Sequence, residues 1–236
     1  MEIFISELIG TWMMILIGDS VVANVCLDKS AMKGAGTLQI TITWGFAVLL
    51  PACIFGKLSG AHFNPALTLA LAAEGSTPWA LVPQYIAGQM FGAILGAICV
   101  YILFAKHFEV TKDADVKLGI FCTSPSIPCT TLNLLSEIIG TFVLVFAIKG
   151  VPHVSDIPSG INTILVSIIV MTVGMSLGGL TGYAINPARD LGPRIAHAIL
   201  PIPGKRDSNW HYAWIPVLGP ILGALLAVGV YHMIPW

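Results

Sequence analysis

Long apolar runs, interrupted by few charges, dominate the chain. Each run approaches the roughly 17–25 residues that a helix needs to cross a bilayer. The first run contains Glu7 and no small-residue cleavage site is evident, so we interpret it as a span rather than a signal peptide. The pattern therefore predicts six transmembrane helices. They are Ile3–Val25, Leu38–Phe55, Leu81–Phe104, Leu132–Ile148, Ile161–Leu177 and Ala213–Ile234.

Two further apolar stretches, about Pro65–Ala73 and Pro187–Ile199, are only long enough for half a span. Asparagine is a favoured N-cap and proline a favoured first helical residue. We therefore expect two re-entrant half-helices whose N-termini meet near the bilayer midplane. Their loops must line a water-filled cavity or be buried in protein. Each begins at an Asn-Pro-Ala motif, formed by Asn64, Pro65 and Ala66 and by Asn186, Pro187 and Ala188.

The two halves of the chain resemble each other. "ISELIG", "LSGAHFNPAL" and "GQMFGAILGA" return as "LSEIIG", "LTGYAINPAR" and "GPILGALLAV". Each half holds three spans and one short segment, and an odd number of spans reverses the orientation of the second half. We therefore expect an inverted repeat. The halves, about 1–105 and 130–236, would form a single transmembrane channel domain over residues 1–236.

Composition agrees with a membrane protein. Of the 236 residues, 56% are hydrophobic and 10% are charged, against about 25% charged in a soluble domain. A net charge of −1 gives no basic face for nucleic acid. No nucleophile–base pair or metal-ligand spacing is visible, so we expect no enzyme, cofactor or metal. The five cysteines are interpreted as packing or loop residues, with a Cys122–Cys129 disulfide left open.

Carboxylates inside apolar runs need an explanation, because each costs about 2.5–3.5 kcal/mol on insertion scales. Glu7 and Glu137 occupy duplicated positions, which favours a structural role as acceptors for backbone N–H groups of the re-entrant loops. The alternative is proton or ion coupling. Asp19, near the end of the first span, is expected at the membrane interface or, alternatively, at the pore mouth. Glycines at small-residue spacing suit close helix contact: Gly10, Gly88, Gly92, Gly96, Gly140, Gly219 and Gly223.

With its paired motifs, duplicated Ser-Glu pair and "GYAINPARDLGP", the chain resembles the major intrinsic protein family of aquaporins and glycerol facilitators over nearly its whole length. Asp190, Arg194 and the Pro216-Val217 pair are similar to the glycerol-facilitator branch. The resemblance implies the aquaporin fold, a homotetramer with one pore per protomer, and a position in the cell membrane. It also implies a selectivity filter of Trp44, Gly174, Tyr183 and Arg189, with Tyr183 replacing the family's usual phenylalanine.

These residues suit a polyol. Arg189 offers a rigid fork of donors for adjacent hydroxyls, Trp44 and Tyr183 offer apolar walls, and Gly174 leaves space. Asn64 and Asn186 each offer two N–H donors and one acceptor and, aimed at the pore axis, would donate to a passing oxygen. With the positive half-helix N-termini, they would orient passing oxygens and oppose proton relay.

Two neighbouring side chains have open roles. We expect His62 to pack and to offer its carbonyl, with a pH gate as the alternative. We expect Asp190 to neutralise charge near Arg189 or to bind local backbone.

Orientation does not follow cleanly from charge. If the N-terminus is cytoplasmic, as the resemblance implies, the inner loops hold Lys57 and Lys149. The outer segments then hold the other nine basic residues, against the positive-inside rule. They are Lys29, Lys33, Lys106, Lys112, Lys117, Arg189, Arg194, Lys205 and Arg206.

The sequence therefore predicts a passive channel for glycerol, other small neutral polar solutes and water, which excludes ions and protons. An alternative keeps the pore but changes the cargo to undissociated lactic acid, dihydroxyacetone, urea or hydrogen peroxide. A second alternative is a coupled secondary transporter, since inverted repeats and broken helices also occur there. A gated ion channel would need a charged ring or filter sequence that is not visible.

Overall fold

The computed structural model describes residues 1–153 and 160–235. The remaining residues, which belong to the expected half 130–236, lie outside the described part. Within it, all regular secondary structure is helical. The six long helices are α1 (Glu2–Cys26), α2 (Thr37–Ser59), α4 (Val82–Val110), α6 (Thr130–Gly150), α7 (Ile161–Thr181) and α9 (Ile215–Tyr231). The three short ones are α3 (Pro65–Ala73), α5 (Ala114–Phe121) and α8 (Pro187–Ile199), with single 3-10 turns at Trp79–Leu81 and Val151–His153.

The six long helices occupy the six apolar runs. Five of them have at least 18 residues and are apolar enough to cross a membrane. The sixth, α9, has 17 residues, or about 26 Å of helix, which is at the lower limit for a span. The order α1, α2, α3, α4 is repeated as α6, α7, α8, α9.

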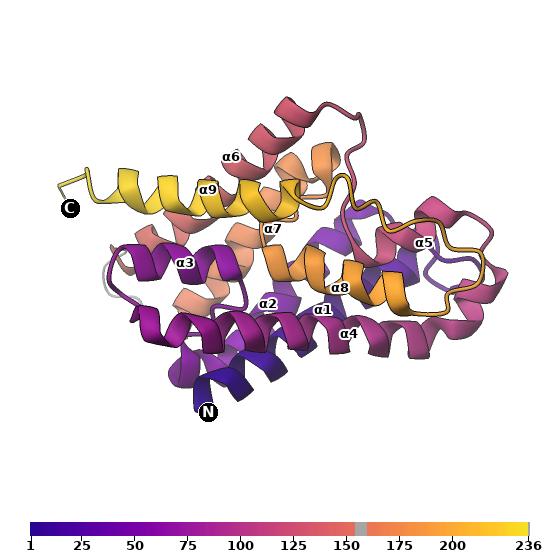
Figure 1. Ribbon diagram of the computed structural model, residues 1–236, viewed down its shortest axis with the longest axis horizontal. Helices are drawn as coiled ribbons and strands as arrows, with labels where there is room; N and C mark the ends of the chain where they lie inside the picture. The colour runs from indigo at the N-terminus through magenta and orange to yellow at the C-terminus, as the bar shows by residue number, and fades with distance from the viewer. Residues whose placement is uncertain (154–159, 236) are drawn as a thin grey trace.

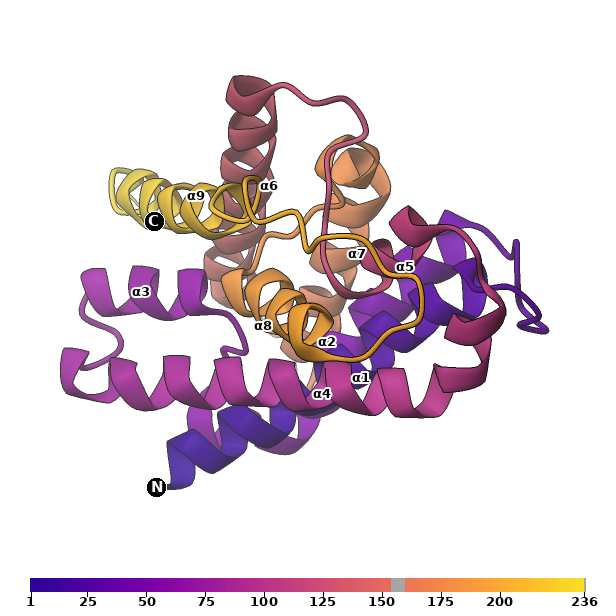
Figure 2. The same ribbon diagram turned by 45° about the vertical axis from the view of Figure 1, so that its right-hand side comes forward.

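Half-helices α3 and α8 begin and end where the sequence predicts. They lie end to end between α4 and α9, with their N-termini directed at each other in the centre of the molecule (Figures 1 and 2). Each starts with a proline after an asparagine cap. Pro tolerates this position because the first N–H of a helix has no intrahelical partner. Since the N-termini converge, the backbone of both preceding loops reaches the middle of the structure.

Glycines let the long helices approach closely in two equivalent pairs, α1 with α4 and α6 with α9. A Cβ at Gly92 of α4 would lie 2.3 Å from the Leu8 carbonyl oxygen, and a Cβ at Gly223 of α9 would lie 2.2 Å from the Ile138 carbonyl oxygen. Only a residue without a side chain allows such backbone contact.

Gly10 and Gly140 differ from this expectation. A Cβ at Gly10 would lie 2.0 Å from the Phe63 ring, and one at Gly140 would lie 3.2 Å from Ile185. These glycines therefore make room for side chains of the re-entrant loops rather than for another long helix.

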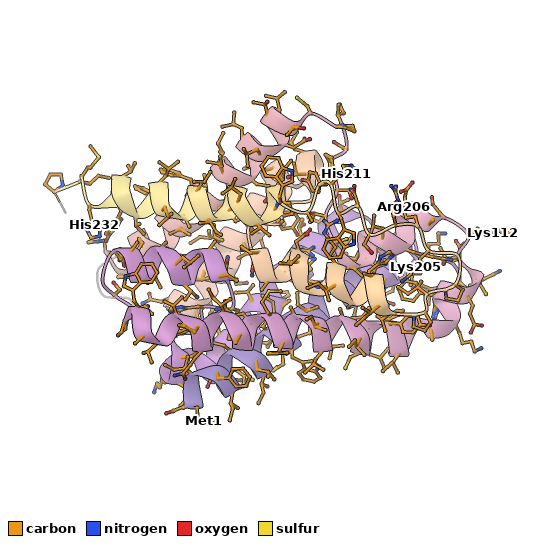
Figure 3. All side chains as sticks on the ribbon, in the orientation of Figure 1. Met1, Lys112, Lys205, Arg206, His211 and His232 are labelled. Atoms are coloured by element: carbon orange, nitrogen blue, oxygen red, sulfur yellow. The ribbon has the colours of Figure 1, made fainter. Side chains whose placement is uncertain are left out.

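The sequence analysis missed helix α5. It has eight residues, and its N-cap Asp113 accepts from the backbone N–H groups of Asp115 and Val116. Asp113 as an N-cap was the available signal. Figure 3 places Lys112, beside this helix, at one end of the long axis with Lys205 and Arg206, whereas Met1 and His232 lie toward the other. The two chain termini therefore share one side of the molecule.

Candidate functional site

The first re-entrant loop is anchored by a buried carboxylate of α1. One oxygen of Glu7 accepts from the Ser59 hydroxyl (2.6 Å) and the His62 backbone N–H (3.0 Å). The other accepts from the Phe63 backbone N–H (2.7 Å) and the Gln89 amide (2.8 Å). Backbone groups that lipid could not satisfy therefore have acceptors within the protein.

Glu137 of α6 repeats the arrangement for the second loop. It accepts from the Thr181 hydroxyl (2.6 Å) and from the backbone N–H groups of Ala184 (3.0 Å) and Ile185 (2.9 Å). Every carboxylate oxygen of this residue and of Glu7 is engaged by the fold. The predicted structural bonds are thus present, and neither group offers a free oxygen for ion coupling.

Both loops carry the same unusual backbone. Ala61 and Phe63 have φ of 53° and 47°, and the equivalent Tyr183 and Ile185 have φ of 39° and 44°. Left-handed conformations cost non-glycine residues about 1–3 kcal/mol each, and they persist where surrounding structure fixes them. The carboxylate bonds supply that constraint in both halves, because they hold the N–H groups of Phe63 and Ile185.

The two asparagines cap their own half-helices. Asn64 Oδ1 accepts from the Ala66 N–H at 2.9 Å, and Asn186 Oδ1 accepts from the Ala188 N–H at 3.0 Å. An N-cap side chain satisfies one of the donors that a helix start leaves open. The amide oxygens are therefore occupied, and only amide N–H groups remain for other partners.

The asparagines also tie the two half-helices together. Asn64 Nδ2 donates to the Ile185 carbonyl at 2.8 Å, and Asn186 Nδ2 donates to the Phe63 carbonyl at 2.7 Å. One N–H of each amide is used in this cross-connection. Of the two donors counted on each asparagine, one is therefore used within the protein, and each amide keeps one further N–H.

Two cavities adjoin each other, and one of them reaches the asparagines. The inner one has a volume of about 70 Å³ and includes both asparagines in its lining. The outer one has a volume of about 670 Å³, and its lining includes Gly119 of α5 and Gly174 of α7. Three side chains line both cavities, namely Trp44, Tyr183 and Arg189. These three therefore stand at the constriction between the two spaces.

The constriction has an aromatic side and a cationic side. The guanidinium of Arg189 lies over the Trp44 ring, 4.1 Å from its centroid. Tyr183 fills the space left by Gly174, where a Cβ would lie 2.8 Å from its ring. Among the described residues, Trp44 Nε1, Tyr183 Oη and Arg189 Nη1 have no hydrogen-bond partner in the protein. The narrowest region thus combines ring faces with unsatisfied polar atoms.

His62 lies on the inner side. It lines the inner cavity, its ring stacks on Tyr85 with centroids 4.3 Å apart, and its Nδ1 lies 3.1 Å from the Thr68 hydroxyl. Packing therefore fixes the ring, as expected from the sequence.

Asp190 pairs with Arg194 rather than with Arg189, and it binds backbone, which was the second of its two expected roles. It forms an ion pair with Arg194 at 2.8 Å and accepts from the Thr123 N–H and hydroxyl, both at 2.7 Å. Arg194 also donates to the Thr123 carbonyl at 2.9 Å. This cluster ties α8 to the segment after α5.

The acid beside Arg189 is Asp19 of α1, for which the sequence analysis left the membrane interface and the pore mouth as alternatives. Asp19 is 0% exposed and its Oδ1 lies 3.7 Å from Arg189 Nη1, which agrees with the pore-mouth alternative. A single charged residue in an apolar run gives no indication of which neighbour it faces, so the sequence could not identify this pair.

The cysteines and the possible metal ligands are two further candidate features. All five cysteines are free thiols, so Cys122 and Cys129 do not form a disulfide. In residues 1–153 and 160–235, no group of three His, Cys, Asp or Glu side chains is arranged to hold a metal ion.

At the inner end, Glu74 ends half-helix α3 and accepts from Lys149 of α6 at 2.8 Å and from Ser76 at 2.6 Å. His232, labelled in Figure 3, lies 3.2 Å from its other oxygen. Burial opposes ionisation of Glu74, but these hydrogen bonds outweigh it and hold its pKa below the ordinary value. The cluster fastens α3 to the second half of the chain.

Six spans and two half-helices that meet beside a constricted passage define an integral membrane channel. The profile of the family "Major intrinsic protein" matches residues 1–231, and the chain belongs to that family. It is therefore a multi-pass channel of the cell membrane and not an enzyme.

Curated relatives cover almost the whole chain. It is 52% identical over 232 residues to the "Glycerol uptake facilitator protein" of Bacillus subtilis, with 98% of this chain and 84% of that protein covered. It is 50% identical over 232 residues to the "Probable glycerol uptake facilitator protein" of Thermotoga maritima, with 98% and 99% covered. Among solved structures, the aquaglyceroporin from Plasmodium falciparum superposes with a TM-score of 0.86 at 27% identity, with 99% of this chain and 96% of that chain covered.

Proposed function

We propose that the chain forms a passive pore for glycerol, related small uncharged solutes and water. The observation that carries this proposal is the constriction shared by the two cavities, where Trp44, Tyr183 and Arg189 meet. The relatives named as glycerol uptake facilitators support the same substrate class.

The proposed selectivity filter consists of Trp44, Gly174, Tyr183 and Arg189. A glycerol molecule has a carbon edge and a hydroxyl edge. The carbon edge would slide along the rings of Trp44 and Tyr183, whose faces exclude water from it. The hydroxyls would accept from the fork of Arg189, which makes no side-chain hydrogen bond to protein within the described residues. Gly174 gives Tyr183 room to stand back from the passage.

Asn64 and Asn186 supply the second proposed contact point. Each has one amide N–H beyond its cross-connection, and both residues line the inner cavity. A solute oxygen that accepts from these donors must turn its own hydrogens away from them. This fixed direction interrupts a continuous chain of proton transfer along water.

Ions are excluded by two features of the same region. The N-termini of α3 and α8 each carry roughly half a positive charge, which repels cations at the centre of the pore. The inner cavity is lined mainly by apolar side chains, so an ion that sheds its hydration shell finds few ligands to replace it.

Reconstituted protein tests the proposal. Proteoliposomes exposed to an inward glycerol gradient should shrink and then reswell faster than empty liposomes, without electrical current. Glycerol reswelling at the rate of empty liposomes would reject the glycerol pore.

A different main cargo is favoured by one residue. Tyr183 places a hydroxyl with no partner among the described residues at the constriction, which makes the filter more polar than a phenylalanine would. We therefore propose testing undissociated lactic acid, dihydroxyacetone, urea and hydrogen peroxide beside glycerol, at several pH values. A solute that permeates faster than glycerol would take its place as the main cargo.

Assembly and orientation are further parts of the proposal. Many large apolar side chains on the outer faces of the helices are exposed, such as Phe91, Leu103 and Ile164, and they are available to lipid or to neighbouring protomers. We propose a homotetramer with one pore per protomer and with both termini in the cytoplasm. Native mass spectrometry in detergent should give a mass of four chains; a monomer as the largest species would refute the assembly.

A further inference from the structure

Asp19 is a buried carboxylate beside the constriction with an unusual lack of partners. It is fully buried, and neither of its oxygens has a hydrogen-bond partner among the described residues. Its nearest cationic atom is Arg189 Nη1, 3.7 Å away. The distance is within ion-pairing range but longer than a hydrogen bond. Its one ion pair in the described chain is therefore the one with Arg189.

No other acid in the described chain is available to Arg189. Asp190 follows it directly, but both oxygens of Asp190 are taken by Arg194 and Thr123. Glu7 and Glu137 are fully engaged by the re-entrant loops. The ion pair with Asp19 is the one salt bridge of Arg189 in this part of the chain.

The carboxylate stands behind the filter rather than in it. Asp19 lines neither the inner nor the outer cavity, whereas Arg189 lines both. The guanidinium is bounded by the Trp44 ring, 4.1 Å away, and by Asp19. A passing solute therefore meets the donors of Arg189 and not the carboxylate.

We propose that Asp19 is a positioning and specificity-determining residue: it compensates the charge of Arg189, so that the filter donates to hydroxyl groups without binding small anions. This inference rests on the filter proposed above. A bare guanidinium beside an aromatic ring and shielded from water would be an anion site, since planar anions match its fork of donors. With Asp19 behind it, the pair has no net charge, and a neutral polyol keeps its advantage over an anion of similar size.

The variant Asp19→Asn removes the charge and keeps the shape. Glycerol reswelling of proteoliposomes is measured while gluconate is replaced by thiocyanate or formate at constant ionic strength. Because a hydrogen bond to a charged group contributes about 1.5–3 kcal/mol, the half-inhibitory anion concentration should fall at least about tenfold relative to wild type. The double variant Asp19→Asn/Arg189→Gln should lose this sensitivity again.

Asp28→Asn is the matched control. It removes the same charge from the loop after α1, where Asp28 pairs with Lys33, and should respond to anions as wild type does. Asp19→Ser provides a second neutral variant if Asp19→Asn does not assemble. Where a variant conducts water but little glycerol, osmotic water flux gives the same titration.

Equal anion sensitivity of wild type and Asp19→Asn would overturn the inference, as would a sensitivity that persists in the double variant. Failure of the proposed glycerol pore is a separate result, because it shows as the absence of wild-type glycerol flux without any added anion.

Discussion

A methyl group added at Gly174 tests the constriction directly. A Cβ there would lie 2.8 Å from Tyr183 Cζ, 2.9 Å from Tyr183 Cε2 and 3.0 Å from Thr41 Cγ2. Carbon atoms in contact normally lie about 3.5–4.0 Å apart. The Tyr183 ring must therefore move by at least about 0.7 Å. Because Gly174 belongs to α7, the added methyl group pushes the Tyr183 ring away from this helix and toward the passage.

The movement of the Tyr183 ring should lower the permeability of glycerol more than that of water, because glycerol is the larger solute. Discrimination by one methylene in an apolar pocket corresponds to about 1–3 kcal/mol, or about 10- to 200-fold. We expect the glycerol permeability of Gly174→Ala to fall within this range. Water needs a smaller opening, so its permeability should fall by a smaller factor than that of glycerol. The water-to-glycerol ratio should consequently rise.

Stopped-flow light scattering on proteoliposomes measures both rates in one preparation. Gly178→Ala is a second test, because its Cβ would lie 2.7 Å from Tyr183 Cδ1. Gly179→Ala is the matched control on the same helix, since its Cβ would meet no atom within 4 Å. The reasoning is refuted if Gly174→Ala leaves glycerol permeability unchanged, or if it lowers water and glycerol permeability by the same factor.

Three further outcomes follow from the buried and exposed polar groups. Glu137→Gln presents one amide oxygen where two backbone N–H groups and a hydroxyl need acceptors; at about 1–3 kcal/mol per unsatisfied group, the melting temperature in detergent should fall by about 2–10 °C, and an unchanged value would contradict this. The lowered pKa of Glu74 means that its pairing with Lys149 stabilises the fold above the ordinary carboxyl pKa of about 4.3 and is lost as pH falls through the lower folded value. The melting-temperature advantage of wild type over Glu74→Gln should therefore be present at neutral pH and vanish in acid, and an advantage that persists in acid would refute this pairing. A membrane-impermeant maleimide applied outside cells should modify the exposed Cys129 but not Cys122, whose thiol is buried with its pKa raised by that burial; modification of Cys129 only after permeabilisation would reverse the proposed orientation.

The sequence was sufficient for the six long helices and the two half-helices, because each depends on a local signal, whereas the short helix α5 was missed. Length and apolarity predict the long helices, and an Asn cap followed by Pro predicts both half-helices with the observed bounds. The duplicated positions of Glu7 and Glu137 indicated a shared structural task, and their bonds to the loop backbone agree with it. Because the repeat shows the same pattern twice, the structural role of these two residues could be predicted.

Contacts between residues that lie far apart in the sequence could not be predicted. Nothing local to Asp19 indicates that it faces Arg189, whereas the i,i+4 spacing of Asp190 and Arg194 on the predicted half-helix was an available signal for that pair. The donors of Asn64 were counted correctly, but the carbonyl that uses one of them lies in the other half of the chain. Such pairings depend on how the two halves dock, and no duplicated motif encodes that geometry.

The crossed asparagine tethers also set an order of events during biogenesis. The bond from Asn64 reaches a carbonyl 121 residues further along the chain, and a ribosome needs roughly 6–24 s to synthesise that length at about 5–20 residues per second. Until then the first half-helix is in the bilayer without the carbonyl group that accepts from Asn64 at its N-terminus. Its placement must therefore be completed after translation of the second half, which makes the centre of the pore among the last parts of the molecule to mature.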